Sequence, residues 1–161
     1  MYMKRRPVLR IRPFCAQDAD RVGSILRSSP EASPWSIEDL LRFSENAFGQ
    51  NATFLVCESS GEVTAFLMAR SVGGEAELLN IAVSPAQRCS GQATQLLKCA
   101  MDQLRGSAID TIFLEVRESN MLARAFYEKH GFSVSGRRPN YYQRPDEAAV
   151  SMMRKLTASL S

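Results

Sequence analysis

The segment Arg88-Cys89-Ser90-Gly91-Gln92-Ala93 lies between a strand-like run and a strongly helical pattern. The run before it ends at Val83-Ser84-Pro85, and the apolar pairs at 96/97 and 100/101 recur at helical spacing. The first N–H groups of a helix have no acceptor within the helix, and the helix dipole adds positive potential there. Gly91 and Ala93 keep the chain slim, so a pyrophosphate could approach those N–H groups closely. Taken alone, a plain connection from strand to helix explains the six residues about as well.

Periodicity and turn residues predict the other elements around this segment. The expected strands are 8–14, Thr53–Glu58, Val63–Arg70, Ala76–Val83, Thr111–Arg117, Ser133–Arg138 and Ala148–Lys155. The expected helices are 19–26, a segment capped by Ser36, a segment reaching Leu104, and a short one capped by Ser119 or Asn120 and ended by Gly131. The order β-α-α-β-β-β-α-β-α-β-β implies an α/β fold, with a single mixed sheet and helices on both faces.

Length and composition are those of one globular domain. The chain has 161 residues, of which 45% are hydrophobic and 23% charged, and its formal net charge is +3. This charge is too small for a general nucleic-acid binder, and no apolar run is long enough to cross a membrane. We expect a basic N-terminal arm over 1–8, one folded domain over 9–156 and a C-terminal tail over 157–161.

The cysteines and the single histidine do not form a metal-binding pattern. The four cysteines lack CxxC spacing, and the sequence has only one histidine, so a structural zinc site is not expected. We therefore expect no metal. Reduced thiols and the lack of an apolar segment like that of a signal peptide predict a cytoplasmic protein.

Several motifs carry a family resemblance. A mixed sheet whose central strand runs into Arg88-x-x-Gly91-x-Ala93 resembles the acetyl-CoA-binding element of the GNAT superfamily of N-acetyltransferases. The segments Leu114–Asn120 and Ala125–Phe132 are similar to the ribosomal-protein-alanine N-acetyltransferase (RimI) family, as are Pro34-Trp35-Ser36 and Arg137–Tyr142. The resemblance implies a single-domain GNAT-like fold with a mixed, mostly antiparallel sheet. It also implies acetyl transfer to the N-terminal α-amine of a protein, with a ribosomal protein beginning with alanine or a similar small residue as acceptor.

The same resemblance implies acetyl-CoA as co-substrate and assigns its binding residues. The strand before the loop would lie along the pantetheine arm, and the loop amides would bind the pyrophosphate. The residues so implied are Ile81, Ala82, Val83, Arg88, Cys89, Ser90, Gly91, Gln92, Ala93, Thr94 and Asn120. At the positions of Cys89 and Ser90 the family often has a second basic or polar residue. This chain departs from that pattern, and the departure bears on the affinity for the cofactor and not on the cofactor's identity. Asn120 is equally explained as a helix cap, and both roles are compatible.

Glu115 is the candidate general base. An attacking amine must be neutral, and a carboxylate can take its proton directly or through water. The resemblance places Glu115 at the family's general-base position. Without the motif, a Glu115–Arg117 pair at a wet sheet edge is the simpler explanation, since the two side chains share one face of the strand.

Tyr127 is the candidate general acid. A phenol can donate a proton to the departing thiolate of the coenzyme, and the family's general acid lies where Tyr127 stands. Standing alone, Tyr127 would more often be a core residue, because it shares a helical stripe with Ala123 and His130. His130 titrates near neutrality, but its place beside Gly131 fits a residue at a helix end, and we leave it out of the site.

Trp35, Tyr141 and Tyr142 are candidates for the wall of a substrate groove, and surface-strand aromatics are an equal alternative. Two other functions remain open at this point. Many GNAT proteins acetylate small amines, and a non-catalytic acyl-CoA-binding module would keep the same fold. Retention of both Glu115 and Tyr127 argues against the second. Cys89, beside Arg88 at a helix start, is expected to be the most readily alkylated of the four cysteines and to be protected by acetyl-CoA.

Overall fold

The structure is a computed structural model that describes residues 7–49 and 51–156. Its strands are β1 (Leu9–Pro13), β2 (Asn51–Ser59), β3 (Glu62–Val72), β4 (Glu75–Val83), β5 (Thr111–Arg117), β6 (Ser133–Tyr142) and β7 (Glu147–Lys155). Its helices are α1 (Ala19–Arg27), α2 (Ile37–Ser44), α3 (Gln92–Gly106) and α4 (Met121–Lys129), with short 3₁₀ helices η1 (Ala16–Asp18) and η2 (Pro85–Gln87). The predicted order of strands and α-helices is confirmed. Most of the predicted arm (1–6) and the whole predicted tail lie outside the described residues.

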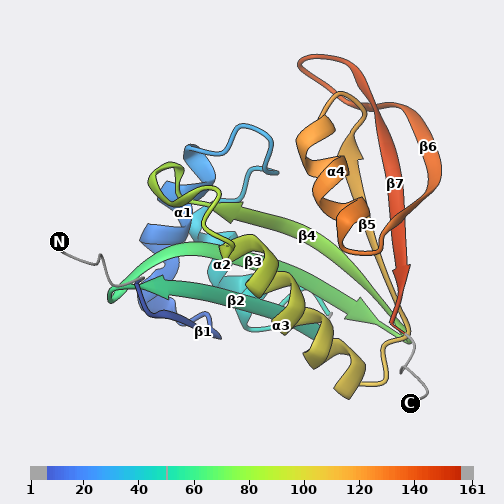
Figure 1. Cartoon of the computed structure of the whole chain (residues 1–161). Helices are drawn as coiled ribbons and strands as arrows, with labels where there is room; N and C mark the ends of the chain where they lie inside the picture. Colours follow the sequence, from blue (N-terminus) through green and yellow to red (C-terminus); the bar gives the residue numbers. More distant parts are fainter. Residues whose placement is uncertain (1–6, 50, 157–161) are drawn as a thin grey trace, which may run out of the picture.

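The sheet has the strand order β1-β2-β3-β4-β5-β7-β6, and β4–β5 is its parallel pair. These two strands pair only where Glu75–Glu77 lie beside Thr111–Phe113, and they then diverge (Figure 1). A bulge in β4 accompanies the divergence: Met68 pairs with Asn80 and Ala69 with Leu78, so Leu79 is an extra residue. Bulges bend strands. The mixed, mostly antiparallel sheet predicted above is therefore split at its centre.

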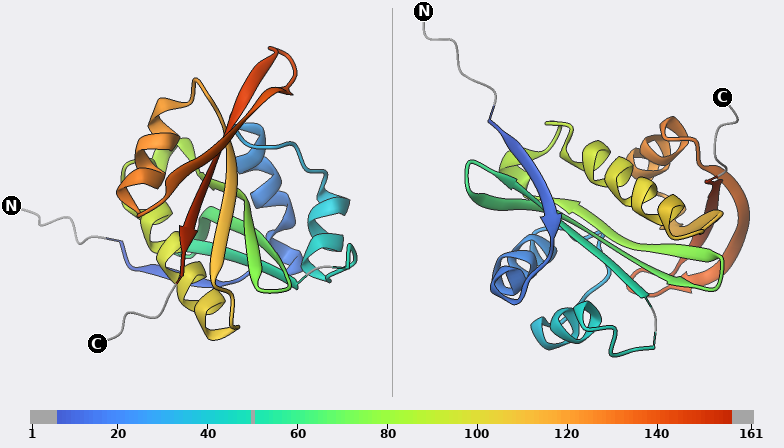
Figure 2. Two further views of the ribbon diagram at one scale, coloured as in Figure 1. Left: turned by 90° about the vertical axis from the view of Figure 1, so that its right-hand side faces the viewer. Right: turned by 90° about the horizontal axis from the view of Figure 1, so that it is seen from below.

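Helices cover both faces of the sheet, as predicted (Figure 2). One core lies under α3 and α4, where buried residues such as Leu97, Ile112 and Tyr127 meet. The other lies under α1 and α2 and includes Leu40 and Phe66. Alternation along β5 places Leu114 in the first core, so the neighbouring Glu115 faces the opposite side.

Local capping chemistry fixes several helix ends. The Ser36 hydroxyl accepts a hydrogen bond from the Asp39 amide at 3.0 Å, and the Asn120 side chain accepts one from the Ala123 amide at 3.1 Å. Gly131 follows α4 with a φ of +85°, a conformation that favours glycine. Ser36, Asn120 and Gly131 thus act as predicted, with Asn120 being the cap of α4.

The predicted strand ends agree with the observed ones to within two residues, with one exception. The sixth strand was expected to end at Arg138, but β6 continues to Tyr142, which pairs with Glu147 on β7. The register shifts between Arg138 and Tyr142, so the pairing is irregular there. β6 is an edge strand, and its residues around Pro139 are polar or aromatic and exposed. The alternation of apolar and polar residues that marks a half-buried strand is therefore absent, and the sequence did not predict this extension.

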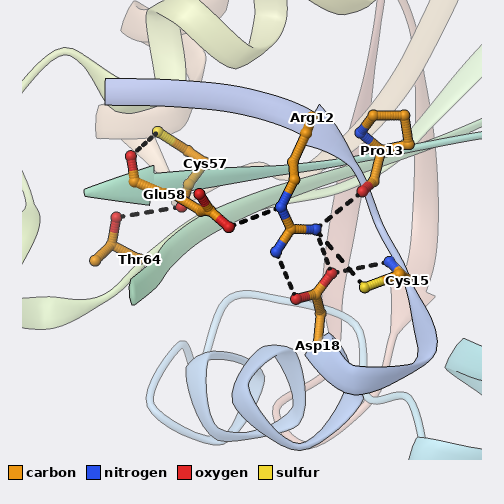
Figure 3. Close-up of polar contacts among 7 residues, drawn as sticks. All are labelled: Arg12, Pro13, Cys15, Asp18, Cys57, Glu58 and Thr64. Atoms are coloured by element: carbon orange, nitrogen blue, oxygen red, sulfur yellow. Dashed lines mark hydrogen bonds and ion pairs between the residues drawn. The ribbon is translucent and has the colours of Figure 1, made fainter. Parts of the chain in front are cut away.

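An ion-pair network holds the first strand to the rest of the molecule (Figure 3). The Arg12 guanidinium contacts Asp18 at 2.7 Å and Glu58 at 2.7 Å, linking β1 to η1 and β2. The hydrogen bonds from Arg12 are the main cause that lowers the pKa of the buried Asp18 carboxyl. Asp18 also accepts a hydrogen bond from the Cys15 amide at 2.8 Å. The network therefore fixes the turn that leads into α1.

Candidate active site

A narrow cleft opens where β4 and β5 separate. Its volume is about 410 Å³, and its walls are residues 78–83 of β4 and 114–117 of β5. The inner side of α4 and residues 29–33 between α1 and α2 close its ends. Pairing of β4 with β5 ends at Glu77, so the strands beyond that point leave room between them. The cleft is a direct consequence of the split sheet.

A wider cleft of about 870 Å³ includes the other side of β5. Its lining includes Phe48, Arg70, Arg138 and Tyr141, from segments far apart in the sequence. Glu115 and its neighbour Leu114 line both clefts. Glu115 therefore lies at the border between the two clefts.

The Glu115 carboxylate is held from two sides. The Ser151 hydroxyl on β7 donates a 2.7 Å hydrogen bond to one oxygen, and the Arg138 guanidinium on β6 lies 3.2 Å from the other. The side chain is only 16% exposed. The alternative of a Glu115–Arg117 pair at a sheet edge is wrong, because β5 lies between β4 and β7 and Arg117 pairs with Glu147 at 3.3 Å.

Tyr127 is buried, 8% exposed, and its side chain lines the narrow cleft. Phe126 and Phe132 pack on its ring edge-to-face, with centroids 5.3 and 5.5 Å away. Burial raises the pKa of Tyr127 well above its ordinary value. The phenol thus stays protonated at neutral pH, as a proton donor must. Tyr127 therefore has the core packing expected of an isolated aromatic, and it also lines the narrow cleft.

The loop that joins η2 to α3 presents free backbone donors. Within the described residues, no amide from Arg88 to Thr94 donates to a backbone carbonyl, and the first helical bond runs from Gln95 to Gly91 at 3.1 Å. Gly91 has a φ of +81°, and a side chain there would meet nothing within 4 Å. Glycine is therefore needed for its conformation, and the surface above it is open. Such a row of free amides at a helix start suits an anion.

Side chains of this loop do not all face the cleft. Arg88 and Ala93 line it, whereas Cys89 is exposed. The Gln92 side chain turns into the core, 1% exposed, and accepts a 2.7 Å hydrogen bond from Thr64. Gln92 can contribute to the predicted cofactor site only through its backbone. The Arg88 guanidinium turns back to the Ser28 carbonyl at 3.1 Å, which ties the loop to the end of α1.

Five other predicted site residues lie together in one cleft. Ile81, Ala82, Val83, Asn120 and Tyr142 line the narrow cleft, together with Tyr127. Burial is the main cause that raises the pKa of Tyr142, to about 12.

Tyr141 lines the wide cleft instead. Trp35 packs edge-to-face on Phe43, with centroids 5.4 Å apart, in a separate hollow that shares Phe48 and Arg70 with the wide cleft. The three predicted wall aromatics therefore do not form one wall.

Sequence reasoning missed the two partners of Glu115. Arg138 belongs to the segment Arg137–Tyr142 that carried part of the resemblance, but nothing singled it out from Arg137. Ser151 has no local signal at all. It reaches Glu115 because β7 lies next to β5 with these two residues in direct register. Ser151 is a half-buried polar residue on β7, and its role becomes evident only from the pairing of β7 with β5.

The profile of the acetyltransferase (GNAT) family matches residues 20–132, which is more than half of the chain. The chain belongs to the GNAT acetyltransferase family. Its relatives include the [ribosomal protein bS18]-alanine N-acetyltransferase of Haemophilus ducreyi, 35% identical over 88% of this chain and 97% of the relative. The enzyme of the same name from Escherichia coli K12 is 34% identical over 80% of this chain and 84% of the relative.

Solved structures agree with the GNAT assignment. The crystal structure of the ribosomal-protein-S18-alanine N-acetyltransferase from Escherichia coli superposes with a TM-score of 0.80 at 30% identity, covering 94% of this chain and 96% of that one. Ard1 from Thermoplasma volcanium gives a TM-score of 0.84 at 26% identity, covering 93% and 99%. The GNAT-like fold and the resemblance to the RimI family expected from sequence are confirmed.

This GNAT protein is an N-acetyltransferase, and the co-substrate of the family is acetyl-CoA. The residues present fit that molecule. The narrow cleft combines apolar β4 side chains with the free amides of residues 88–94, which match a pantetheine arm and a pyrophosphate respectively.

No helix in 7–49 and 51–156 is both long and apolar enough to cross a membrane. The same residues contain no group of three or more His, Cys, Asp or Glu side chains arranged to hold a metal ion.

Proposed function

We propose that this chain transfers the acetyl group of acetyl-CoA to the N-terminal α-amine of a protein. The proposed acceptor is a ribosomal protein whose first residue is alanine, since the similar enzymes of Haemophilus ducreyi and Escherichia coli carry that substrate in their names. An acceptor of this kind also supports the proposed cytoplasmic location. Residues 9–156 are proposed as the catalytic domain, which agrees with the bounds of the sheet from β1 to β7.

The observation that carries the proposal is the position of Glu115 between the two clefts. Acetyl-CoA supplies the acetyl group as a reactive thioester, and the narrow cleft has the apolar wall and free amides to hold it. The wide cleft, about 870 Å³, has room for several residues of an extended chain, more than a small amine needs. A direct transfer in a ternary complex follows from this two-sided arrangement.

The residues of the site then divide the proton transfers. Glu115 takes a proton from the α-ammonium, which leaves the amine neutral for attack. A free α-amine has a pKa of about 7.7–8.0, so a modest base is sufficient near neutrality. Tyr127, kept protonated by burial, gives its proton to the leaving sulfur. Backbone atoms of Ile81 to Val83 are proposed to orient the pantetheine arm, and the amides around Gly91 the pyrophosphate.

A substrate panel tests the proposal. Purified protein and acetyl-CoA are incubated with a peptide that begins with free alanine, the same peptide with a blocked N-terminus and an internal lysine, or spermidine. Release of free thiol gives the rate, and mass spectrometry locates the acetyl group. We expect fast acetylation of the free-alanine peptide alone. Preference for the internal lysine or for spermidine would overturn the assigned acceptor.

A further inference from the structure

Glu115 has one fixed partner and one movable partner. Ser151 is fixed, because β7 pairs with β5 and places it directly opposite Glu115. Arg138 extends from the edge strand β6, which pairs with β7 alone, and its side chain is 63% exposed. Its guanidinium also lies 5.7 Å from the centre of the Tyr141 ring. Arg138 can therefore leave Glu115 for solvent at low cost, whereas Ser151 cannot.

The Glu115 carboxylate needs a cation close to it. A carboxylate that is largely removed from water is costly to leave without a compensating charge. In this structure Arg138 provides that charge from the wall of the wide cleft, the side on which the acceptor is proposed to enter. An arriving α-ammonium carries the same charge to the same carboxylate. If the ammonium group replaces the guanidinium, the negative charge of the Glu115 carboxylate stays paired with a positive charge throughout.

We propose that Arg138 is a positioning residue that occupies the place of the acceptor's ammonium group and is displaced when the acceptor binds. Between turnovers Arg138 compensates the negative charge of Glu115, and it competes with the acceptor for that carboxylate. Once displaced, Arg138 no longer contacts the base, and Ser151 alone keeps the carboxylate aligned. This inference rests on the proposed function, from which it takes Glu115 as the general base. It depends on the positive charge of the acceptor amine and not on whether that amine belongs to a protein or a small molecule.

The exchange predicts a particular kinetic effect. Without the guanidinium, an acceptor meets no competing cation, so Arg138→Gln should lower the acceptor's KM by about twofold to fivefold, the range set by an exposed ion pair. The kcat should change by less than about twofold, because Arg138 has already left Glu115 in the bound complex. Arg138→Lys keeps a cation and should restore a KM close to that of the wild type.

Arg137 offers a matched control. It is the neighbouring residue on β6, lines the same wide cleft and pairs with a glutamate, Glu118, at 2.8 Å, but it does not contact Glu115. Arg137→Gln removes the same charge from the cleft and leaves the Glu115 pair intact. If this variant lowers KM as much as Arg138→Gln does, the effect is that of general charge and the exchange is wrong.

The experiment measures kcat and KM for the alanine peptide at saturating acetyl-CoA in the wild type, Arg138→Gln, Arg138→Lys and Arg137→Gln. Thermal melting of each variant checks that it folds. If the glutamine variant does not fold, Arg138→Met, which also removes the charge, takes its place. A higher KM or a large fall of kcat in Arg138→Gln would overturn the inference, since Arg138 would then bind the acceptor or assist the chemistry. If the wild type rejects the peptide, the proposed function fails, and the same comparison with the amine that it does acetylate decides the exchange.

Discussion

Glu115 and Ser151 face each other across the β5–β7 ladder, and the serine hydroxyl donates a 2.7 Å hydrogen bond to the carboxylate. The pair joins a residue that resembles the family's general base to a serine that no sequence motif indicated. It also fixes the direction in which the remaining carboxylate oxygen points, toward the wide cleft where Arg138 lies.

Replacing Ser151 with alanine should lower kcat by about tenfold or more, because a hydrogen bond to a charged group contributes ~1.5–3 kcal/mol. The KM for acetyl-CoA should stay near the wild-type value, since Ser151 does not line the narrow cleft. Ser151→Thr keeps the hydroxyl and should retain most of the activity. Steady-state kinetics of both variants provides the test, and equal activity of the alanine variant and the wild type would show that the hydrogen bond does not position the base.

Glu115→Gln should reduce turnover by ~10²–10⁴-fold at neutral pH while leaving acetyl-CoA binding intact, the usual effect of losing a general base. The deficit should shrink as the pH rises above the pKa of the α-amine, ~7.7–8.0, because the amine then loses its proton without help. Rate profiles from pH 6 to 9 and calorimetric titration with acetyl-CoA measure the two effects. A severalfold loss that is the same at every pH would indicate a structural or purely electrostatic role.

Tyr127→Phe removes only the hydroxyl, so the packing of Phe126 and Phe132 on the ring is preserved. We expect a fall of turnover of about 10²-fold or more with little change in melting temperature. Because burial raises the pKa of Tyr127, its deprotonation should not limit the rate in mildly alkaline solution. Wild-type turnover in the phenylalanine variant would assign the proton donation to solvent or another group.

Brief treatment with iodoacetamide should label Cys89 fastest of the four cysteines. Cys57 is buried and Cys99 partly so, and burial raises the pKa of both thiols. Cys15 is exposed like Cys89 but follows β1, away from the narrow cleft, so it is an internal control. Acetyl-CoA should slow the labelling of Cys89 and leave that of Cys15 unchanged in mass-spectrometric mapping. Fast labelling of Cys89 that acetyl-CoA does not slow would require the pyrophosphate to be placed elsewhere.

The Asp18 carboxylate should make the free energy of unfolding depend on pH. Its pKa is lowered in the folded protein, so its contribution is present above the ordinary value of 3.8 and is lost as the pH falls below it. Asp18→Asn should cost about 1.5–3 kcal/mol of unfolding free energy at pH 7 and should flatten the stability curve below pH 4. Asp102→Asn is the control, because Asp102 also pairs with an arginine, Arg105 at 2.9 Å, but is 77% exposed. Urea titrations from pH 3 to 7 that give both variants the same curve would contradict this role.

Local patterns in the sequence determined the elements and their order. Caps and periodicity act within a few residues, so Ser36, Asn120 and Gly131 marked their helix ends correctly. The strand Thr111–Arg117 was predicted with both ends correct. The motifs around Gly91, Glu115 and Tyr127 also indicated the family, because each motif consists of neighbouring residues and can be recognised without knowledge of the fold.

The tertiary structure alone decided what surrounds the base. Ser151 lies 36 positions from Glu115, and Arg138 comes from an edge strand that does not even pair with β5. The extra residue Leu79 and the end of pairing at Glu77 open the cleft between β4 and β5. Strand order and register arise from packing and hydrogen bonds between distant segments, and an alternating pattern gives the face of a side chain but not its neighbour on the next strand.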